Sequence, residues 1–134
     1  MNRKGKVESM NLGLDGKIVL VLASSKGIGK SIAEGFAQEG AKVMITSRNK
    51  TLLKKTATEI IEKTNAHVRY KTCELKKDAS IKSLVNYTVN EFGTIDILVN
   101  NTGGPPKGYF KDFKDEDWQE AYELTFMSYV RAIR

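Results

Sequence analysis

Short runs of buried-type residues alternate along this chain with segments whose apolar residues recur at helical spacing. Residues 18–23 are all apolar and rich in Leu and β-branched types, which predicts a strand over 17–23 that is buried on both faces. Further strands are predicted over 41–46, 67–72 and 94–100. Strands joined through helices lie parallel, with right-handed crossovers. The sequence therefore predicts the α/β class, with a doubly wound parallel sheet present in part as four strands alternating with helices.

The segments between these strands each present one apolar helical face. The three faces are Ile28, Ile32, Ala33, Phe36 and Ala37, then Leu52, Leu53, Ala57, Ile60 and Ile61, then Ile81, Leu84, Val85, Val89 and Phe92. The third helix is predicted to be capped by Asp78 and to end at Gly93. A last helix is predicted to begin near the acids at 115–117, which suit a helix N-terminus. Its apolar face is predicted to hold Trp118, Tyr122, Tyr129 and Ile133.

A chain of 134 residues is expected to form one domain. Residues 1–14 are predicted to be a flexible N-terminal lead, and residues 15–134 to be the domain. Residues 18–23 are the longest apolar run, far short of the roughly 20 residues that cross a bilayer. The basic N-terminus is not followed by the apolar segment of a signal peptide. We therefore expect no membrane partner and a cytoplasmic protein.

The formal net charge of +6 could suit a nucleic-acid partner. The basic residues are scattered, however, and their tightest groups, at 3–6, 54–55 and 76–77, hold no interleaved aromatic residues. Nucleic-acid binding is therefore not expected. Cys73 and His67 are the single cysteine and histidine of the chain, so neither a disulfide nor a metal site is expected. Cys73 is predicted to be a buried hydrophobe at a strand end.

The first predicted strand leads directly into a glycine-containing turn at the start of a helix. Glycines in such a turn let the backbone approach a pyrophosphate, and the helix N-terminus offers unpaired N–H groups and the positive end of its dipole. The alternative is that the glycines only permit close packing of helix on strand. The cofactor-contacting residues predicted here are Ser24, Ser25, Lys26, Gly27, Ile28 and Gly29.

The second predicted strand is followed directly by Ser47 and Arg48. In dinucleotide-binding folds an acid at this place holds the adenosine ribose of NAD, whereas an arginine suits the 2′-phosphate of NADP. Arg48 can pair with phosphate oxygens through two parallel hydrogen bonds, and Lys26 adds a point charge. The sequence thus predicts NADP(H) as the cofactor. Alternatively, Arg48 is a solvent-exposed loop residue.

Two motifs resemble those of the short-chain dehydrogenase/reductase family, and the resemblance covers residues 14–134. The family motif Thr-Gly-x-x-x-Gly-Ile-Gly aligns with residues 22–29, where Leu22 and Ala23 replace the Thr-Gly pair. The motif Asn-Asn-Ala-Gly aligns with Asn100, Asn101, Thr102 and Gly103. The resemblance implies a Rossmann-like fold, weaker cofactor binding because of the Ala23 methyl group, and asparagines that tie the fourth strand to its neighbour near the adenosine.

The same family places an Asp-hydrophobic pair after the third strand, with its carboxylate near the adenine. Glu74 and Leu75 occupy that place here. The resemblance implies a contact from Glu74 to the adenine amino group. The alternative is an exposed loop acid.

The resemblance also implies a carbonyl reductase or alcohol dehydrogenase that acts by hydride transfer through an Asn-Ser-Tyr-Lys group. None of the five tyrosines is followed four residues later by lysine, so this chain is expected to be truncated before that motif. Thr125 stands at the position of the family asparagine and is a weak catalytic candidate. Whether the chain is an enzyme stays open, although alone it is expected to be inactive; a non-catalytic nucleotide-binding module or half of a split enzyme is the alternative.

Truncation would leave residues 95–99 as an apolar sheet edge, a template for pairing with other strands. The aromatic face of the last helix is, by resemblance, a subunit interface. Homo-oligomerisation or a complementing chain is therefore expected. The sequence does not predict the substrate.

Overall fold

Parallel strands alternate with helices along residues 10–134, the part of the chain that the computed structural model describes. The elements are β1 (Ile18–Val21), α1 (Gly27–Gln38), β2 (Lys42–Ser47), α2 (Lys50–Thr64), β3 (Val68–Thr72), α3 (Asp78–Phe92), β4 (Ile97–Val99), η1 (Phe110–Asp112), α4 (Asp115–Tyr122), η2 (Glu123–Met127) and α5 (Ser128–Ile133). Four strands form one parallel sheet in the order β3-β2-β1-β4, as predicted. Of the predicted flexible lead, residues 1–9 lie outside the described residues.

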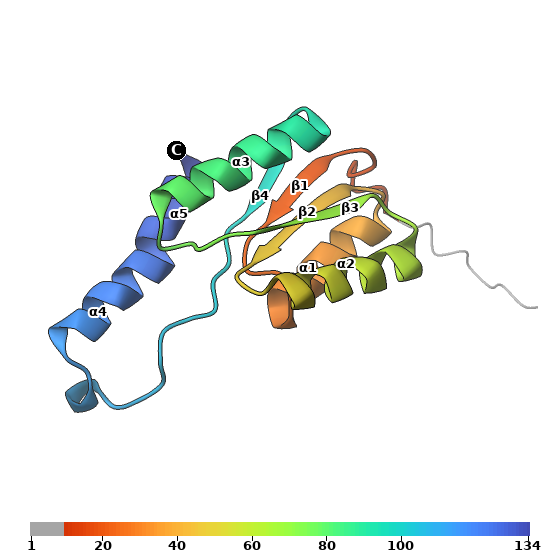
Figure 1. The fold of residues 1–134 in the computed structure, drawn as a ribbon. Helices are drawn as coiled ribbons and strands as arrows, with labels where there is room; N and C mark the ends of the chain where they lie inside the picture. The colour runs from red at the N-terminus through yellow and green to blue at the C-terminus, as the bar shows by residue number, and fades with distance from the viewer. Residues whose placement is uncertain (1–9) are drawn as a thin grey trace, which may run out of the picture.

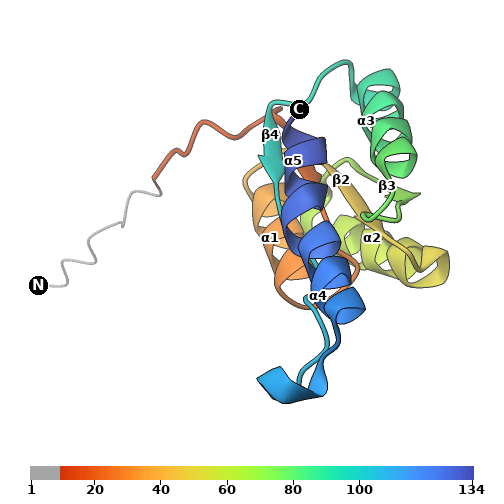
Figure 2. The same cartoon turned by 90° about the vertical axis from the view of Figure 1, so that its left-hand side faces the viewer.

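Helices cover both faces of this sheet (Figures 1 and 2). One face holds α1 and α2, and the other holds α3 and α5. Leu20 in β1 lies in register between Met44 in β2 and Leu98 in β4, so β1 is a central strand while β3 and β4 are the edges. The chain thus runs from β1 outward to β3 and then crosses back to β4, which reverses the strand order beside β1.

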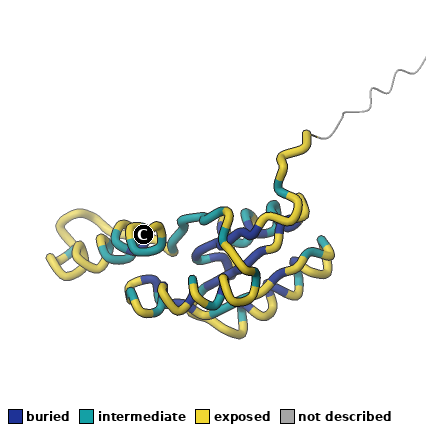
Figure 3. The backbone as a smooth tube through the Cα atoms, turned by 90° about the horizontal axis from the view of Figure 1, so that it is seen from above, coloured by how far each residue is buried: buried dark blue, intermediate teal, exposed yellow. Residues whose placement is uncertain are grey.

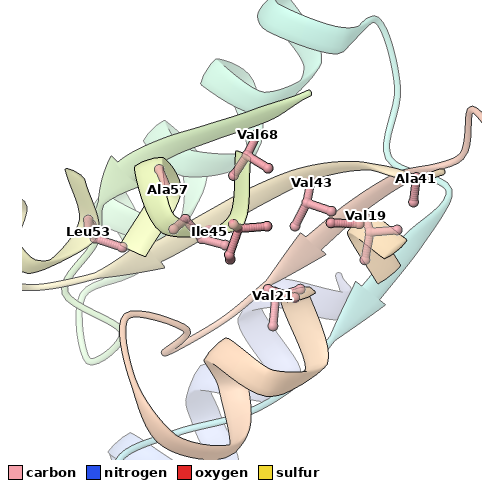
Figure 4. Close-up of a cluster of buried hydrophobic side chains, with 11 residues drawn as sticks. Val19, Val21, Ala41, Val43, Ile45, Leu53, Ala57 and Val68 are labelled. Atoms are coloured by element: carbon pink, nitrogen blue, oxygen red, sulfur yellow. The ribbon is translucent and has the colours of Figure 1, made fainter. Parts of the chain in front are cut away.

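Two hydrophobic clusters fix the helices to the sheet. Val19, Val21, Val43 and Ile45 point toward α1 and α2, where they meet buried residues such as Leu53 (Figure 4). On the opposite face, the alternate side chains Leu20, Leu22 and Met44 pack with Ile81 and Leu84 of α3. The strands of this part therefore have two apolar faces, which explains why their sequences show no alternation. Cys73 is buried in the second cluster, as predicted.

Several predicted boundaries differ from the structure. The first strand spans Ile18–Val21 rather than 17–23, and two further differences have a visible structural cause. The fourth strand begins at Ile97 rather than at residue 94, because the Asp96 carboxylate accepts the Ile18 N–H at 2.8 Å and the Asp96 N–H donates to the Ile18 carbonyl. The cap of α3 is Lys77, not Asp78. Asp78 lies inside the first helical turn, where its carboxylate pairs with Lys82 at 2.7 Å and its pKa is lowered by that contact.

The predicted apolar faces also need correction. Ile61 of α2 and Val89 of α3, both assigned to apolar faces, are exposed rather than buried. Ile28 does not pack into the core but is 75% exposed at the start of α1. In the last helix, the exposed apolar residues include Phe126 and Val130, whereas Tyr129 is half-buried. The reason is a π-helical turn, η2, between α4 and α5, which shifts the helical register by its wider turn. No helix within residues 10–134 is long and apolar enough to span a membrane.

Candidate functional site

The predicted cofactor-binding residues gather at the carboxyl ends of the parallel strands. This edge includes the point beside β1 where the strand order reverses, between β1 and β4. In open α/β sheets, ligands bind in the crevice at such a switch point. The turn from β1 to α1 lies here, together with the residues that follow β2, β3 and β4.

Gly27 opens α1 in the left-handed region, at φ +58°, with open space where a side chain would stand. The first intrahelical hydrogen bond is donated by the Lys30 N–H to the Lys26 carbonyl, at 3.3 Å. The amides of Gly27, Ile28 and Gly29 therefore precede the bonding pattern of the helix. Among the described residues no side chain caps this terminus, and its first turn holds no acid. The arrangement suits an anion.

Gly29 has a different role, since there is no room for a side chain on it. A Cβ atom would collide with the Ala23 carbonyl oxygen, with Asn101 Nδ2 at 2.7 Å and with Ser24 Cα at 2.9 Å. Gly29 thus lets α1 pack directly on the turn and on the end of β4. The two interpretations of the glycine motif, close packing and anion approach, apply to different glycines.

Ser24 and Ser25 are buried and fix the turn to its surroundings. Ser24 Oγ donates to the Val21 carbonyl at 2.7 Å and accepts the Thr46 N–H at 3.0 Å. The Ser25 carbonyl accepts from the Thr56 hydroxyl of α2 at 2.7 Å. Thr46 and Thr56, buried threonines of β2 and α2, thereby hold the turn in place. Sequence patterns did not identify Thr56, although a threonine on a buried helical face is the signal that could have done so.

Ala23 adopts φ +47°, a left-handed conformation that favours glycine. This is one of the two positions where the sequence departs from the glycine motif. The methyl group therefore adds backbone strain as well as bulk at this turn.

Two exposed cations stand near this edge. Arg48 follows β2, and Lys26 precedes Gly27; neither forms an ion pair with any residue between 10 and 134. Lys30, by contrast, is paired with Glu59, and this contact lowers the pKa of the Glu59 carboxyl. Ser47 Oγ accepts the Asn49 N–H at 3.2 Å and so shapes the turn in which Arg48 lies. Arg48 and Lys26 are thus cations of this edge available to a ligand.

Glu74 and Leu75 lie beyond the end of β3. The Cys73 N–H donates to the Ser47 carbonyl at 2.9 Å, which carries the chain across to the end of β2. The Glu74 N–H donates to Ser80 Oγ at 2.9 Å, and Glu74 Oε1 accepts from the Lys76 N–H at 3.4 Å. Leu75 is buried in the core beneath. The Glu74 carboxylate is therefore half-buried, with a second oxygen to offer.

The asparagine motif begins immediately after β4. Asn101 Nδ2 donates to the carbonyls of Leu22 and Ala23, at 3.3 and 3.1 Å, so it ties β4 to the turn after β1. The neighbouring Asn100 Oδ1 is buried and has no hydrogen-bond partner within residues 10–134. Thr102 is half-buried and Gly103 exposed.

Thr125 lies in the π-helical turn η2, remote in sequence from the motifs above. Its hydroxyl donates to the Ala121 carbonyl at 2.5 Å, a contact within the helix itself. The described part of the chain contains no cluster of His, Cys, Asp and Glu suited to a metal ion.

Comparison with known proteins places this arrangement in a family. The model of the short chain dehydrogenase family matches residues 17–134. The chain is 38% identical over 125 residues to an uncharacterized oxidoreductase, YvrD, of Bacillus subtilis, covering 93% of this chain and 46% of that protein. It is 35% identical over 120 residues to the 3-oxoacyl-[acyl-carrier-protein] reductase FabG of Escherichia coli, covering 90% of this chain and 48% of the reductase.

The fold agrees with this likeness. L-sorbose reductase of Gluconobacter frateurii, solved with NADPH and L-sorbose, superimposes with a TM-score of 0.88 at 35% identity, covering 93% of this chain and 48% of the reductase. The fold is thus Rossmann-like, as predicted. The chain spans about half the length of the curated relatives that it matches. With a family model that matches nearly all of its described residues, the chain belongs to the short chain dehydrogenase family.

Proposed function

We propose that this chain binds NADP(H) and forms the cofactor-binding part of an oxidoreductase that interconverts a carbonyl compound and an alcohol. The observation that carries the proposal is the open, uncapped N-terminus of α1 at Gly27, placed beside the switch point of the sheet. An anion bound there would meet unpaired amides and the positive end of the helix dipole.

The residues of this edge divide into those that would touch the cofactor and those that hold the others in place. Gly27, Ile28 and the amides of the first turn of α1 would hold the pyrophosphate. Ser24 and Gly29 are occupied by the packing of the turn, so they would act by positioning. The exposed side chain of Ile28 lies beside this terminus and would cover part of a bound dinucleotide.

The preference for NADP(H) over NAD(H) would depend on Arg48, assisted by Lys26. Both are exposed, and a guanidinium can bind a 2′-phosphate through two parallel hydrogen bonds. Ser47 would contribute through the turn that it shapes. Two solved relatives favour this preference, since L-sorbose reductase of Gluconobacter frateurii and the actinorhodin polyketide ketoreductase were both solved with NADPH.

The adenine would lie between the ends of β3 and β4. The free oxygen of the Glu74 carboxylate would accept from the adenine amino group, while Leu75 anchors the loop. Asn101 would keep the end of β4 close to the turn, and Thr102 and Gly103 would flank the adenosine.

When bound, the nicotinamide cofactor supplies a hydride. Proton transfer to the substrate oxygen needs a further acid or base, and a tyrosine can serve near neutral pH only if a nearby cation lowers its pKa. None of the five tyrosines is followed four residues later by lysine, and the Thr125 hydroxyl is bonded within its own helix. We infer that the 134-residue chain alone binds the cofactor without turning over carbonyl substrates.

Uncovered apolar surface on β4 and on the last helices suggests a second candidate: the chain is half of a split enzyme, or it forms an oligomer. The residues of β4, Ile97, Leu98 and Val99, are only half-buried at the sheet edge. The last helices expose Trp118, Tyr122, Phe126, Val130 and Ile133. Light scattering of the purified chain tests this idea: a strictly monomeric chain at high concentration would remove the support for oligomerisation.

The cofactor assignment is tested by titrating the chain with NADPH and NADH and following the nicotinamide fluorescence. We expect NADPH to bind more tightly. Replacing Arg48 by Ala is expected to weaken NADPH about tenfold, the loss of one charge-assisted contact, and to leave NADH unchanged. Lys42→Ala is the matched control, because Lys42 is an exposed cation at the other end of β2. Equal affinities for the two cofactors would overturn the NADP(H) preference.

The phosphate site is tested by Gly27→Asp, which places a carboxylate in the open space before α1. We expect NADPH affinity to fall by more than about tenfold through charge repulsion at the helix N-terminus. Gly93→Asp is the control, since Gly93 has φ +90° and equally open space but lies at the end of α3. Unchanged NADPH binding in a folded Gly27→Asp protein would refute the site.

A further inference from the structure

A groove of about 700 Å³ runs along the outer edge of β3. Its floor is β3, and its walls are α2 and α3, which lie below and above that strand in Figure 1. The sheet order makes β3 an edge strand, so no strand of the described chain covers this side. The groove therefore lies beside a strand that is paired on one side only.

Half of the backbone N–H and C=O groups of β3 point toward the groove, where no strand of the described chain pairs with them. The His67 carbonyl and the Cys73 N–H, which bracket β3, both bond to β2, each at 2.9 Å. Consecutive residues of a strand direct their backbone groups to opposite sides, so Val68, Tyr70 and Thr72 point theirs away from β2 and into the groove. An extended peptide laid in the groove would meet an alternating row of donors and acceptors.

The side chains give the groove two chemically different ends. Because α2 follows β2 directly and precedes β3, Lys50 and Lys54 lie toward the carboxyl end of β3, while Ile61 lies toward its beginning. Lys71, which lies 4.9 Å over the ring of Tyr87, adds a cation at the same end as the two lysines.

These three lysines form no ion pair with residues 10–134, unlike Arg69 at the other end, whose charge is paired with Glu91. At that other end, Ile61 is 39% exposed beside Val68. The groove thus presents unpaired positive charge at one end and an apolar surface at the other.

We propose that the β3 edge is a docking site for an extended acidic peptide, which adds to the sheet as a fifth strand and places its acids against Lys50, Lys54 and Lys71. Main-chain hydrogen bonds to β3 would supply affinity, and the lysines would select the sequence. Its apolar residues would cover Ile61. This site runs along the side of β3, whereas the proposed cofactor residues follow the carboxyl ends of the strands; the two sites adjoin where Lys50 follows Arg48.

Two competing roles for the same lysines predict different results. A nucleic acid would use the lysines but not the backbone of β3, since its binding rests on phosphates. Alternatively, the lysines protect the edge strand against pairing, as charged residues on edges commonly do. In that case no peptide would bind.

The test uses fluorescence anisotropy on the full chain with two labelled peptides, Val-Thr-Val-Thr-Glu-Glu-Asp and its reversed sequence, because the direction of the added strand is open. The controls are the same peptides with lysine in place of each acid, and with alternate amides N-methylated. A single-stranded RNA oligonucleotide serves as a competitor. We expect one acidic peptide to bind, the lysine peptides to fail, and N-methylation on the pairing side to abolish binding.

Protein variants locate the site. Lys54→Glu is expected to weaken peptide binding about tenfold, while Lys55→Glu, the same change on another face of α2, stays near wild type. Thr72→Pro removes an outward N–H without touching the ladder to β2 and is expected to abolish binding, in contrast to Thr72→Ala. Absence of binding, equal binding of acidic and basic peptides, insensitivity to N-methylation, or displacement by RNA would each overturn the proposal. If Thr72→Pro does not fold, the N-methylated peptides decide.

Discussion

The chain up to and including α3 buries its apolar side chains much more completely than the chain after it. In the described residues, every fully buried apolar side chain lies between Ile18 and Leu84, whereas the buried residues beyond Leu84 are polar, Thr88 and Ser128. Figure 3 shows the same contrast, with dark blue concentrated in the strands and yellow and teal along the C-terminal helices α4 to α5. The sheet from β3 to β1 therefore has a fully buried hydrophobic core, which we call the finished core, whereas the apolar residues of β4 are only partly buried.

The contrast identifies the strand and helices that lack a packing partner within the described chain. β1, β2 and β4 each have apolar residues on both faces. Only β1 and β2 have a neighbouring strand on each side. β4 has β1 on one side alone, and α4 extends beyond the sheet (Figure 1). Burial of apolar area stabilises by about 25 cal/mol per Å², so the uncovered strand and helix contribute less than their sequence allows. They gain stability only when another surface covers them.

The largest expected effect comes from the pair Leu20 and Leu98, which are neighbours across β1 and β4 on the same face. Leu20 is 1% exposed, so Leu20→Ala should destabilise the chain by about 3–4 kcal/mol through lost burial and a cavity. Leu98 is half-buried, and Leu98→Ala should cost about 1–2 kcal/mol. Urea unfolding measures both. Equal costs would mean that β4 is as well covered as β1.

The next effect separates two glycines of one turn. Gly29→Ala should cost about 3 kcal/mol, because its Cβ would meet the backbone of the turn and Asn101, and so would loosen β4 from β1. Gly27→Ala should cost only about 1 kcal/mol, the strain of a left-handed alanine in open space. Thermal unfolding measures both variants. A cost at Gly27 as large as that at Gly29 would contradict the division of roles between the two.

A smaller, opposite effect is expected at Ala23, the residue that Asn101 ties to β4. Ala23→Gly should stabilise the chain by about 0.5–1 kcal/mol, since relief of the left-handed strain at φ +47° outweighs the greater freedom of glycine in the unfolded chain. Ala41→Gly, at a buried alanine with ordinary φ, is the control and should destabilise. Urea unfolding measures both variants. A loss of stability in Ala23→Gly as well as in Ala41→Gly would contradict backbone strain at Ala23.

The elements of the finished region could be predicted because their signals are local. The continuous apolar strands, the helical spacing between them and the turn glycines each follow from a few neighbouring residues. The two glycines also show the limit: the sequence marks both, but only the neighbours Ala23 and Asn101, brought in by the fold, separate the packing glycine from the open one.

The errors arise where a long-range contact or an irregular helical turn decides the local structure. The start of β4 is set by Asp96, whose carboxylate binds the N–H of Ile18, a partner 78 residues away. The face of the last helix is set by the π-helical turn η2, which no spacing rule anticipates, and so Phe126 and Val130 replace Tyr129. The roles of Arg48, Glu74 and the other cofactor residues stay predictions, because they depend on a ligand.

The smallest expected effect on stability comes from a cysteine variant. It compares the reactivity of one thiol in each region within the same molecule. Cys73 is buried in the finished core, and burial raises the pKa of its thiol. A thiol whose pKa is raised by folding favours the fold below its ordinary pKa and loses that contribution as pH rises, so its thiolate stays scarce near pH 8.

Ile133→Cys adds a second thiol at a position that is 70% exposed in α5. At about pH 8, Ellman's reagent should modify the introduced thiol fast and Cys73 slowly, with both fast in urea. Comparable rates in the folded chain would contradict the contrast in burial. A slow reaction of the introduced thiol that becomes fast on dilution would instead reveal a second copy covering α5, because the apolar face of that helix is then protected only while the chains are associated.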